Sequence, residues 1–431
     1  MRRLVLPPLL AWLFLAFSAA GAQEAVKRGE TLSLDRCVRI ALGHLPALIA
    51  ARAASEADRA LIREAEAAYY PQLGWSSSLG RSYFGSRTSS GVTRASGTYN
   101  SYSTGVNLSQ NIFDFGKTPA QVRIQKLNYS ASVSDVETAV EQAVFAVKQD
   151  FYGVLQAKRN RDVTDEAVKQ YQLHQDQAQA QFEVGLAPKY DVTKAAVDLG
   201  NAKLNLIKAQ NAVKLALSTL NNSMGVAGEL DYDVEDNMSF EPYGLSFDEA
   251  LSAAYGNRPD LASIVAKRQA AESSITLAKT GFFPTLAGTA SYDYSGNTFP
   301  LAKGWSLALN LNVPLFNGFM TTAQVAQARA SLNVLRANEE TLRQSIRLAV
   351  EQAYLNLKQA EELVPVARLN VTAAQENLDI ANGSYKEGVG DPIQVADAIA
   401  ALVSAKIAYI QALYDCKVGR ASLELAMGLK K

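Results

Sequence analysis

The chain has 431 residues, of which 48% are hydrophobic and 19% charged, and its 42 Lys and Arg balance its 42 Asp and Glu. A near-neutral chain lacks the positive charge that nucleic-acid binding requires, so we expect no nucleic-acid partner. Two Cys exclude a disulfide scaffold and a Cys-rich metal site, and two His argue against a His-ligated metal or a His-based triad. We therefore expect no enzyme and no cofactor.

The first 22 residues are predicted to be a secretory signal peptide. Arg2 and Arg3 precede an apolar stretch from Leu4 to Phe17, and Ala20-Gly21-Ala22 provides small residues for cleavage before Gln23. The alternative is a membrane anchor, which the shortness of the apolar run disfavours. No other stretch reaches the ~18 apolar residues of a spanning helix. The expected mature chain is therefore exported, without a transmembrane helix or a lipid anchor.

The mature chain contains one large unit twice. Leu32-Ser33-Leu34-Asp35 recurs as Leu245-Ser246-Phe247-Asp248, at an offset of 213 residues. Farther along the offset becomes 203, as in Met224-Gly225 and Met427-Gly428. Such a long period predicts two copies of one supersecondary unit, not a short-repeat solenoid. The first repeat is placed at 23–225, an acidic linker at 226–244 and the second repeat at 245–431.

Each repeat is predicted to run helix, β-hairpin, very long helix, turn, helix. An Ala-rich helix is expected over 34–69, ended by Pro71. The period then changes to two, which predicts hairpins at about 72–113 and 285–316. In the last of these strands Trp305, Leu307, Leu309, Leu311, Val313 and Leu315 occupy one face. Each strand runs about ten residues, the length of a tilted strand that crosses a bilayer.

Aromatic residues gather in these strands, as they do at the interfaces of a bilayer. The candidate membrane-interface residues are Trp75, Tyr99, Tyr102, Tyr292, Tyr294 and Trp305. Alternation alone also fits a soluble hairpin with a half-buried face, and export together with the aromatics favours the membrane. Four strands cannot close a barrel, and open edges are not viable in lipid. Several chains must therefore pool their strands, and three chains would provide twelve.

The second half of each repeat is predicted to be a long helix and a returning helix. The long helices are expected at about 119–183 and 321–386, with apolar residues at the three-four spacing of a coiled coil. Pro365 should kink or interrupt the second long helix. Gly and Pro in the turns that follow allow the chain to reverse. The predicted tip residues are Val184, Gly185, Leu186, Gly388, Val389 and Gly390.

An exported, duplicated chain with this order of elements resembles the TolC-like outer-membrane efflux family. The resemblance covers about 32–429, and its tip motifs are Phe182 to Leu186 with Asp191-Val192, and Tyr385, Gly388 and Val395. It implies a mainly α homotrimer with four β-strands per chain. The twelve-stranded outer-membrane barrel would continue into a long periplasmic coiled-coil tunnel. It further implies docking, tip first, on a periplasmic adaptor (membrane fusion protein) joined to an inner-membrane pump of the RND or ABC type.

The resemblance also assigns individual residues. Asp397 matches the inner of two aspartates at the periplasmic constriction, and Gln394 stands at the outer position. Three copies of Asp397 would ring a narrow opening and favour cations, more weakly than two rings do. Tyr385 and Asp191 match positions that hold the opening closed, whereas Gly390 replaces the family's arginine. Without the resemblance, Asp397 would be interpreted as a solvated helix carboxylate.

The resulting hypothesis is a passive exit duct, for either small-molecule efflux or type I protein secretion. The alternative is a periplasmic coiled-coil scaffold whose hairpins are soluble. Gly116-Lys117-Thr118 imitates the end of a phosphate-binding loop, but Asn111 stands where that loop requires glycine. Cys37 and Cys416 could pair in an oxidising periplasm. Both fall on predicted helices, which favours burial as free thiols.

Overall fold

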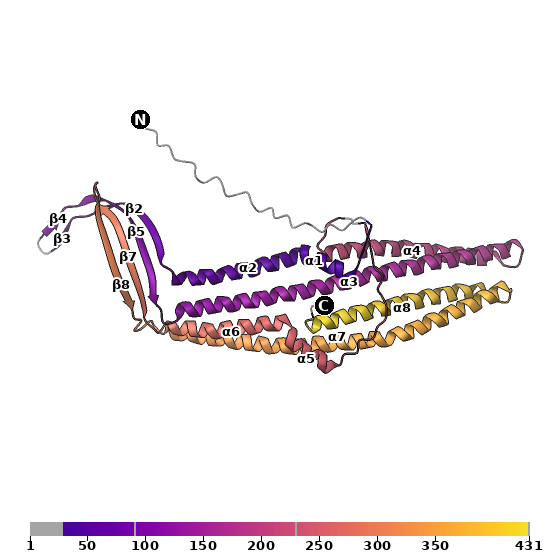
Figure 1. Ribbon diagram of the computed structural model, residues 1–431. Coiled ribbons are helices and arrows are strands. Elements are labelled where there is room, and N and C mark those ends of the chain that lie inside the picture. The colour runs from indigo at the N-terminus through magenta and orange to yellow at the C-terminus, as the bar shows by residue number, and fades with distance from the viewer. Residues whose placement is uncertain (1–28, 90–91, 229–230, 430–431) are drawn as a thin grey trace, which may run out of the picture. The chain divides into compact units, whose positions relative to one another are not determined.

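The computed structural model describes residues 29–89, 92–228 and 231–429, so the predicted signal peptide lies outside the described residues. In each repeat, two shorter helices precede a β-hairpin, a very long helix and a returning helix (Figure 1). The chain divides into two compact units, one formed by the described parts of 1–45 and 147–238, the other by 46–146 and 239–431. These units cut across the two repeats, because the first repeat contributes to both.

The first unit is mainly helical, with one small parallel sheet. Its elements are β1 (Glu30–Leu32), α1 (Leu34–His44), the second half of α3 (Lys117–Glu183), α4 (Lys189–Ser223) and β6 (Tyr232–Val234). β1 pairs with β6 in parallel. Asp236, just past β6, accepts hydrogen bonds of 3.0 and 2.8 Å from Arg159 of α3. The predicted linker at 226–244 therefore contains a β-strand, β6. A strand of three residues is too short to show the alternation from which strands are predicted.

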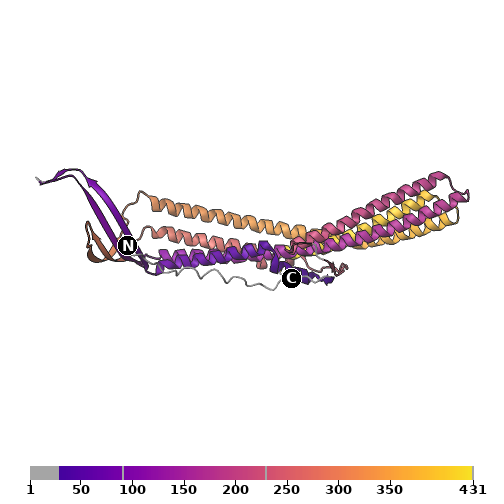
Figure 2. The same ribbon diagram turned by 90° about the horizontal axis from the view of Figure 1, so that it is seen from above.

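The second unit holds the remaining helices and all of the larger sheet. Its helices are α2 (Pro46–Glu66), η1 (Ala67–Tyr69), the first half of α3, α5 (Phe247–Asn257), α6 (Pro259–Thr280), α7 (Met320–Lys386) and α8 (Pro392–Ala426). α7 and α8 lie side by side in both views (Figures 1 and 2). Gly419 permits their close approach, because a Cβ there would lie 3.4 Å from the Cα of Leu357.

The predicted single helix over 34–69 is wrong, because proline divides it. Leu45 is extended (φ −64°, ψ 117°), the conformation that a following proline imposes, and Pro46 begins α2. The second repeat has the same division, with Arg258 extended (φ −63°, ψ 121°) before Pro259. In both repeats, the proline that is predicted to lie inside an Ala-rich helix is therefore the first residue of a second helix.

The predicted interruption at Pro365 is also wrong, since α7 continues through it. Proline removes one backbone hydrogen bond and crowds the preceding turn. Leu357, Ala360 and Val364, in the turns that precede Pro365, are all buried, so the helix is packed up to the proline. A kink at Pro365 stays a prediction.

The long helices recur with equal lengths in the two repeats. α3 and α7 each have 67 residues, and α4 and α8 each have 35. One expectation fails here: α8 contains a segment long and apolar enough, by length and composition, to cross a membrane. Its Val, Ile, Leu and Ala residues include a face buried within the second unit, with Val395, Ile399 and Leu402 among them.

Four antiparallel strands form the larger sheet, in the order β2 (Gln72–Phe84), β5 (Gly97–Phe113), β7 (Thr285–Gly296) and β8 (Ala302–Asn312). The two repeats meet at its centre, where β5 pairs with β7. β2 and β8 are the edges. A small hairpin of β3 (Arg87–Ser89) and β4 (Val92–Arg94) lengthens the first connection, which accounts for the change in repeat offset. Val313 and Leu315 lie beyond the end of β8.

Candidate functional site

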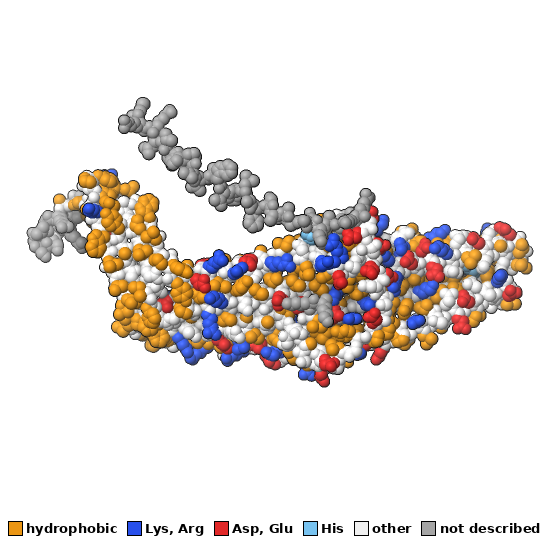
Figure 3. All heavy atoms as spheres, in the orientation of Figure 1, with side chains coloured by type: hydrophobic (Ala, Val, Ile, Leu, Met, Phe, Trp, Pro, Cys, Tyr) orange, Lys and Arg blue, Asp and Glu red, His pale blue; other side chains and the backbone are white. Residues whose placement is uncertain are grey.

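One face of the four-stranded sheet is apolar and exposed. Strand pairing aligns one row across all four strands, and the row is Trp75, Val106, Tyr292 and Trp305. The neighbouring row is Leu73, Leu108, Ala290 and Leu307. Directly paired residues project to the same face, so these rows form one surface. Trp305 is 77% exposed and Leu307 75%, and Figure 3 shows hydrophobic side chains gathered over the strands.

A second group of aromatics, which is not among the predicted interface residues, lies where the strands meet the helices. Its exposed members are Tyr69, Tyr70, Phe113, Phe115, Phe282, Phe283, Phe316 and Phe319. The rings of Phe115 and Phe283 stack at 5.7 Å. The signal was available, because an aromatic pair precedes a proline in both repeats, at 69–71 and 282–284.

The sheet thus has two aromatic zones: the row that contains Trp75, Tyr292 and Trp305, and the second group where the strands meet the helices. An aliphatic band separates the two zones. From Trp305 to Leu311 the chain advances six residues, which is roughly 20 Å along a strand. Leu307, Leu309 and Leu311 lie within this stretch, and all are exposed. An apolar band with aromatic residues on both sides is the pattern of a sheet that crosses a bilayer.

The predicted interface aromatics do not all share this face. Strand pairing puts five of them on the apolar face, but Tyr99 pairs with Ser82 on the opposite one. The Tyr99 ring contacts that of Phe84 at 5.7 Å. Tyr99 therefore does not belong with the other five residues on the apolar face. In β5, odd and even positions lie on opposite faces, and Tyr99 is at an odd position whereas Tyr102 is at an even one.

Apart from Phe84 and Tyr99, the opposite face of the sheet carries small and polar residues. Ser78 and Ser103 are hydrogen-bonded at 2.7 Å, and Ser291 and Ser306 at 3.0 Å. The amide of Asn310 donates to the hydroxyl of Thr289 at 3.3 Å. A sheet with one apolar and one hydrophilic exposed face can border lipid on one side and water on the other.

The two tip turns close in the same way, each in its own unit. After α3, Gly185 has φ +76°, and the N–H of Leu186 donates to Gln181 O at 2.8 Å. After α7, Gly388 has φ +76°, and the N–H of Val389 donates to Ser384 O at 3.1 Å. This is the Schellman motif, which requires a left-handed residue and therefore favours glycine.

Both tips present apolar side chains to solvent. Leu186 is 80% exposed and Val389 is 85% exposed. Val184 and Tyr190 are also exposed, beside Leu186 in the first unit. Exposed aliphatic residues at a tight turn contribute little to the stability of this chain alone, which makes each tip a candidate contact surface.

Gly390 has no room for a side chain. A Cβ there would lie 2.6 Å from the backbone nitrogen of Tyr385 and 2.8 Å from the carbonyl carbon of Ser384. The N–H of Gly390 also donates to Ser384 O at 3.0 Å. An arginine, which the family resemblance places here, therefore requires a different turn.

We expect Gly390→Ala to destabilise the second tip by about 1–3 kcal/mol, because the backbone must move to accept a methyl group. Val389→Ala, at the exposed neighbouring position, is the control and should change stability by less than about 0.5 kcal/mol. Hydrogen exchange of the amides of 384–391 measures the difference. Equal exchange in the two variants would contradict the close contact seen at Gly390.

The predicted constriction residues lie on an exposed face of α8. Gln394 and Asp397 are both exposed and are one helical turn apart. Their neighbours Val395, Ala396 and Ala398 are buried. The predicted latch residues belong to different units: Tyr385 is buried at the end of α7, and Asp191 is partly exposed in the first turn of α4.

The motif that resembles a phosphate-binding loop is already occupied by a side chain. The Asp114 carboxylate accepts the N–H groups of Gly116 at 3.2 Å and Thr118 at 2.8 Å. It also accepts a hydrogen bond of 3.0 Å from the Asn111 amide. The backbone amides that would bind phosphate therefore cap the start of α3.

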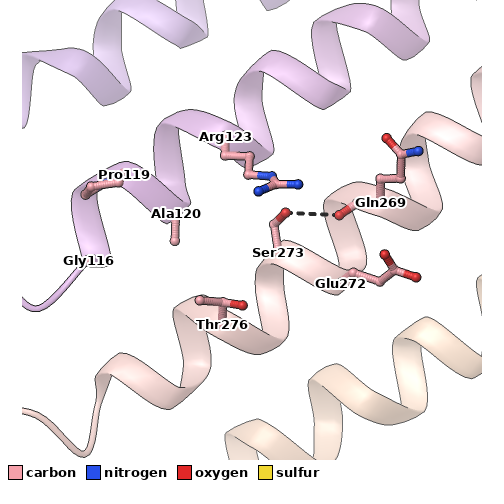
Figure 4. A pocket seen from close by; sticks show the side chains of 8 residues that line it. All are labelled: Gly116, Pro119, Ala120, Arg123, Gln269, Glu272, Ser273 and Thr276. Atoms are coloured by element: carbon pink, nitrogen blue, oxygen red, sulfur yellow. Dashed lines mark hydrogen bonds between the residues drawn. The ribbon is translucent and has the colours of Figure 1, made fainter.

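A groove of about 340 Å³ lies close to the Asp114 cap, between the start of α3 and α6 (Figure 4). Arg123 extends from α3 toward α6, and Glu272 of α6 is ion-paired with Arg268 at 2.9 Å. Its other lining residues are small or uncharged, and the hydroxyl of Ser273 donates to Gln269 O at 3.1 Å. The groove thus lacks a nucleophile beside a base.

The two thiols and His174 are buried. Cys37 and Cys416 are both free and buried, as the sequence favoured. Burial raises the pKa of Cys37 to about 12, which keeps the thiol protonated and unreactive. Burial lowers the pKa of His174, while the nearby Asp198 opposes that shift. In the described part of the chain no group of three or more His, Cys, Asp or Glu is arranged to hold a metal ion.

Comparisons with known proteins agree on one family. Residues 37–226 and 250–429 match the family model of the outer membrane efflux protein. The outer membrane efflux protein BepC of Brucella suis is 24% identical over 368 residues, covering 84% of this chain and 78% of that protein. The outer membrane protein TolC of Escherichia coli K12 is 26% identical over 401 residues, covering 88% and 78%. The solved outer membrane channel CmeC of Campylobacter jejuni has the same fold, with a TM-score of 0.78, 19% identity and coverage of 92% and 85%.

Proposed function

Since this chain belongs to the outer membrane efflux protein family, we propose that it is the exit duct of a tripartite efflux or type I secretion system. The chain is an outer-membrane protein with a periplasmic extension. The observation that carries the proposal is the exposed aliphatic band between two aromatic zones, on a sheet with two unpaired edges. Transport through the duct is passive, and its energy comes from the partner pump.

Closure of the sheet requires other copies of the chain. Unpaired backbone groups at β2 and β8 cannot face lipid, so each edge must pair with another strand. In a homotrimer, β8 of one chain pairs with β2 of the next, which closes a barrel of twelve strands. The apolar face then contacts outer-membrane lipid, and the polar face lines a water-filled lumen.

The helices extend the duct into the periplasm. α3 with α4 and α7 with α8 are the two helical hairpins of each chain, and the three copies of both form a coiled-coil tunnel. The exposed tip residues Leu186 and Val389 dock on a periplasmic adaptor joined to an RND or ABC pump. Tyr385 and Asp191 form the closed-state latch, and Gln394 and Asp397 line the constriction.

Membrane fractionation with heat-modifiable migration tests the duct against the scaffold alternative. The duct should fractionate with the outer membrane and migrate as a trimer in detergent until it is heated. A scaffold with soluble hairpins should instead be found in the periplasm, natively folded and monomeric without detergent. That second result would overturn the proposal.

We expect Asp397→Asn to reduce the cation preference of single channels roughly tenfold at about 0.15 M salt. Three carboxylates in a narrow opening lie close to a passing ion, where screening is incomplete. Reversal potentials in a KCl gradient measure the permeability ratio. The matched gain variant is Gln394→Asp, which should strengthen cation preference by adding a second ring. An unchanged ratio in both variants would remove Asp397 from the constriction.

A further inference from the structure

We propose that Asp293 sets the ion selectivity of the barrel itself, by forming a ring of carboxylates that favours cationic solutes at the exit. This inference rests on the proposed trimeric duct. It concerns a residue of β7 in the sheet, separate from the Asp397 constriction on α8.

The sheet separates its charges by face. Its four strands contain three charged residues, Arg81, Asp293 and Lys303. Arg81 pairs with Asn100 and Lys303 pairs with Tyr294, which places both bases on the face of Trp305. Asp293 pairs with Gly105 and Gly304 on the polar face. The lumen side of the strands therefore carries one formal charge per chain, and that charge is negative.

Glycines on both neighbouring strands lie beside Asp293, which is partly exposed. A Cβ added at Gly105 would lie 2.8 Å from the Asp293 Cβ, so a larger residue cannot stand beside it. A Cβ at Gly304 would lie 3.7 Å from the Asp293 Oδ2. The carboxylate accepts a hydrogen bond of 3.4 Å from the Ser291 hydroxyl. Asp293 is thus partly exposed on the face that the proposed trimer turns toward the lumen.

The size of the barrel determines how strongly such a ring acts. Twelve strands spaced ~4.8 Å apart and tilted by ~40° form a barrel roughly 24 Å across. Three carboxylates then lie roughly 10 Å from the axis, farther than the ~8 Å Debye length at physiological salt. Coulomb attraction with this screening raises the cation-to-anion ratio on the axis about threefold at ~0.15 M salt, and by less than ~1.3-fold at ~1 M.

This dependence on salt distinguishes the two rings. Carboxylates at a narrow constriction remain within a few ångströms of the ion and act even at high salt. A ring in a wide barrel acts only when the ionic strength is low. Asp293 therefore biases the exit toward cationic solutes and against anions in dilute surroundings.

Reversal potentials of purified protein in planar bilayers test the proposal, with KCl gradients centred on ~0.15 M and ~1 M. Asp293→Asn should lower the potassium-to-chloride permeability ratio about threefold at the lower concentration and leave it nearly unchanged at the higher one. The matched control is Lys303→Gln. It removes a charge from the opposite face of the sheet, where Lys303 pairs with Tyr294, the residue next to Asp293. It should leave the ratio unchanged at both concentrations.

Two results would overturn the assignment: an unchanged ratio for Asp293→Asn at low salt, or an equal shift for Lys303→Gln. Conductance steps of wild-type size show that each variant has folded and inserted. Ser291→Asp, a gain variant on the same face, should raise the ratio and keeps the test decisive if Asp293→Asn does not insert. If the wild-type chain forms no channels at all, the proposed duct fails, whereas normal channels insensitive to Asp293 reject only this inference.

Discussion

Leu309→Lys should prevent the chain from assembling as an outer-membrane trimer, whereas Ala308→Lys should leave assembly intact. The two residues are adjacent in β8 but face opposite sides of the sheet, since Leu309 pairs with Gly288 and Ala308 with Thr289. Leu309 lies in the aliphatic band that the proposal places in lipid. Ala308 lies on the polar face, where a lysine remains in water.

The expected free-energy cost of Leu309→Lys to the assembled trimer is large, because the substitution is repeated in every subunit. A lysine on the lipid side of a membrane strand costs about 2–4 kcal/mol near the midplane. Three copies cost roughly 6–12 kcal/mol, which is comparable with the whole stability of a folded domain. Lysine in the lumen should cost less than about 1 kcal/mol.

Membrane fractionation and heat-modifiable gel migration of the two variants measure this difference. Loss of the trimer band in Leu309→Lys alone is the expected result. Equal assembly of both variants would mean that the apolar face does not contact lipid, and the soluble scaffold would then be favoured. Failure of both would point to a general intolerance of β8 and would contradict the assignment of its faces.

The repeat made most of the helical architecture predictable. The predicted long helices at about 119–183 and 321–386 differ by no more than two residues from α3 and α7. Such helices are stabilised by apolar residues at regular spacing, and that spacing is visible in the sequence. The faces of β8 were predictable for the same reason, because the period of two is strict from Trp305 to Leu311.

Other features depend on contacts that a single sequence does not reveal. β1 and β6 have three residues each, and they are strands because they pair with each other across 202 positions of sequence. The face of Tyr99 follows from the register of β5, which only the pairing with β2 establishes. The backbone of Gly390 lies close to that of Tyr385. The sequence indicated only that Gly390 replaces the family's arginine and did not indicate this close contact.

The paired substitutions Leu186→Glu and Val389→Glu should abolish efflux while leaving the channel itself intact. Both side chains are more exposed than most residues of the helices and contribute little to folding. Burial of a leucine or valine on docking contributes about 1.5–3 kcal/mol each. Losing both, and burying carboxylates in their place, should weaken adaptor binding at least ~100-fold, because every ~1.4 kcal/mol is tenfold in affinity.

The conservative pair Leu186→Met and Val389→Ile is the control, since it keeps both tips apolar. Adaptor binding by crosslinking, export activity in cells and single-channel conductance should be measured on both pairs. We expect the charged pair to lose binding and export with normal conductance, and the control pair to keep all three. A charged pair that still binds the adaptor would show that docking uses another surface. Lost conductance together with lost export would instead show that the tips are needed to hold the helices of the duct together, and the adaptor would no longer be required to explain their exposed apolar residues.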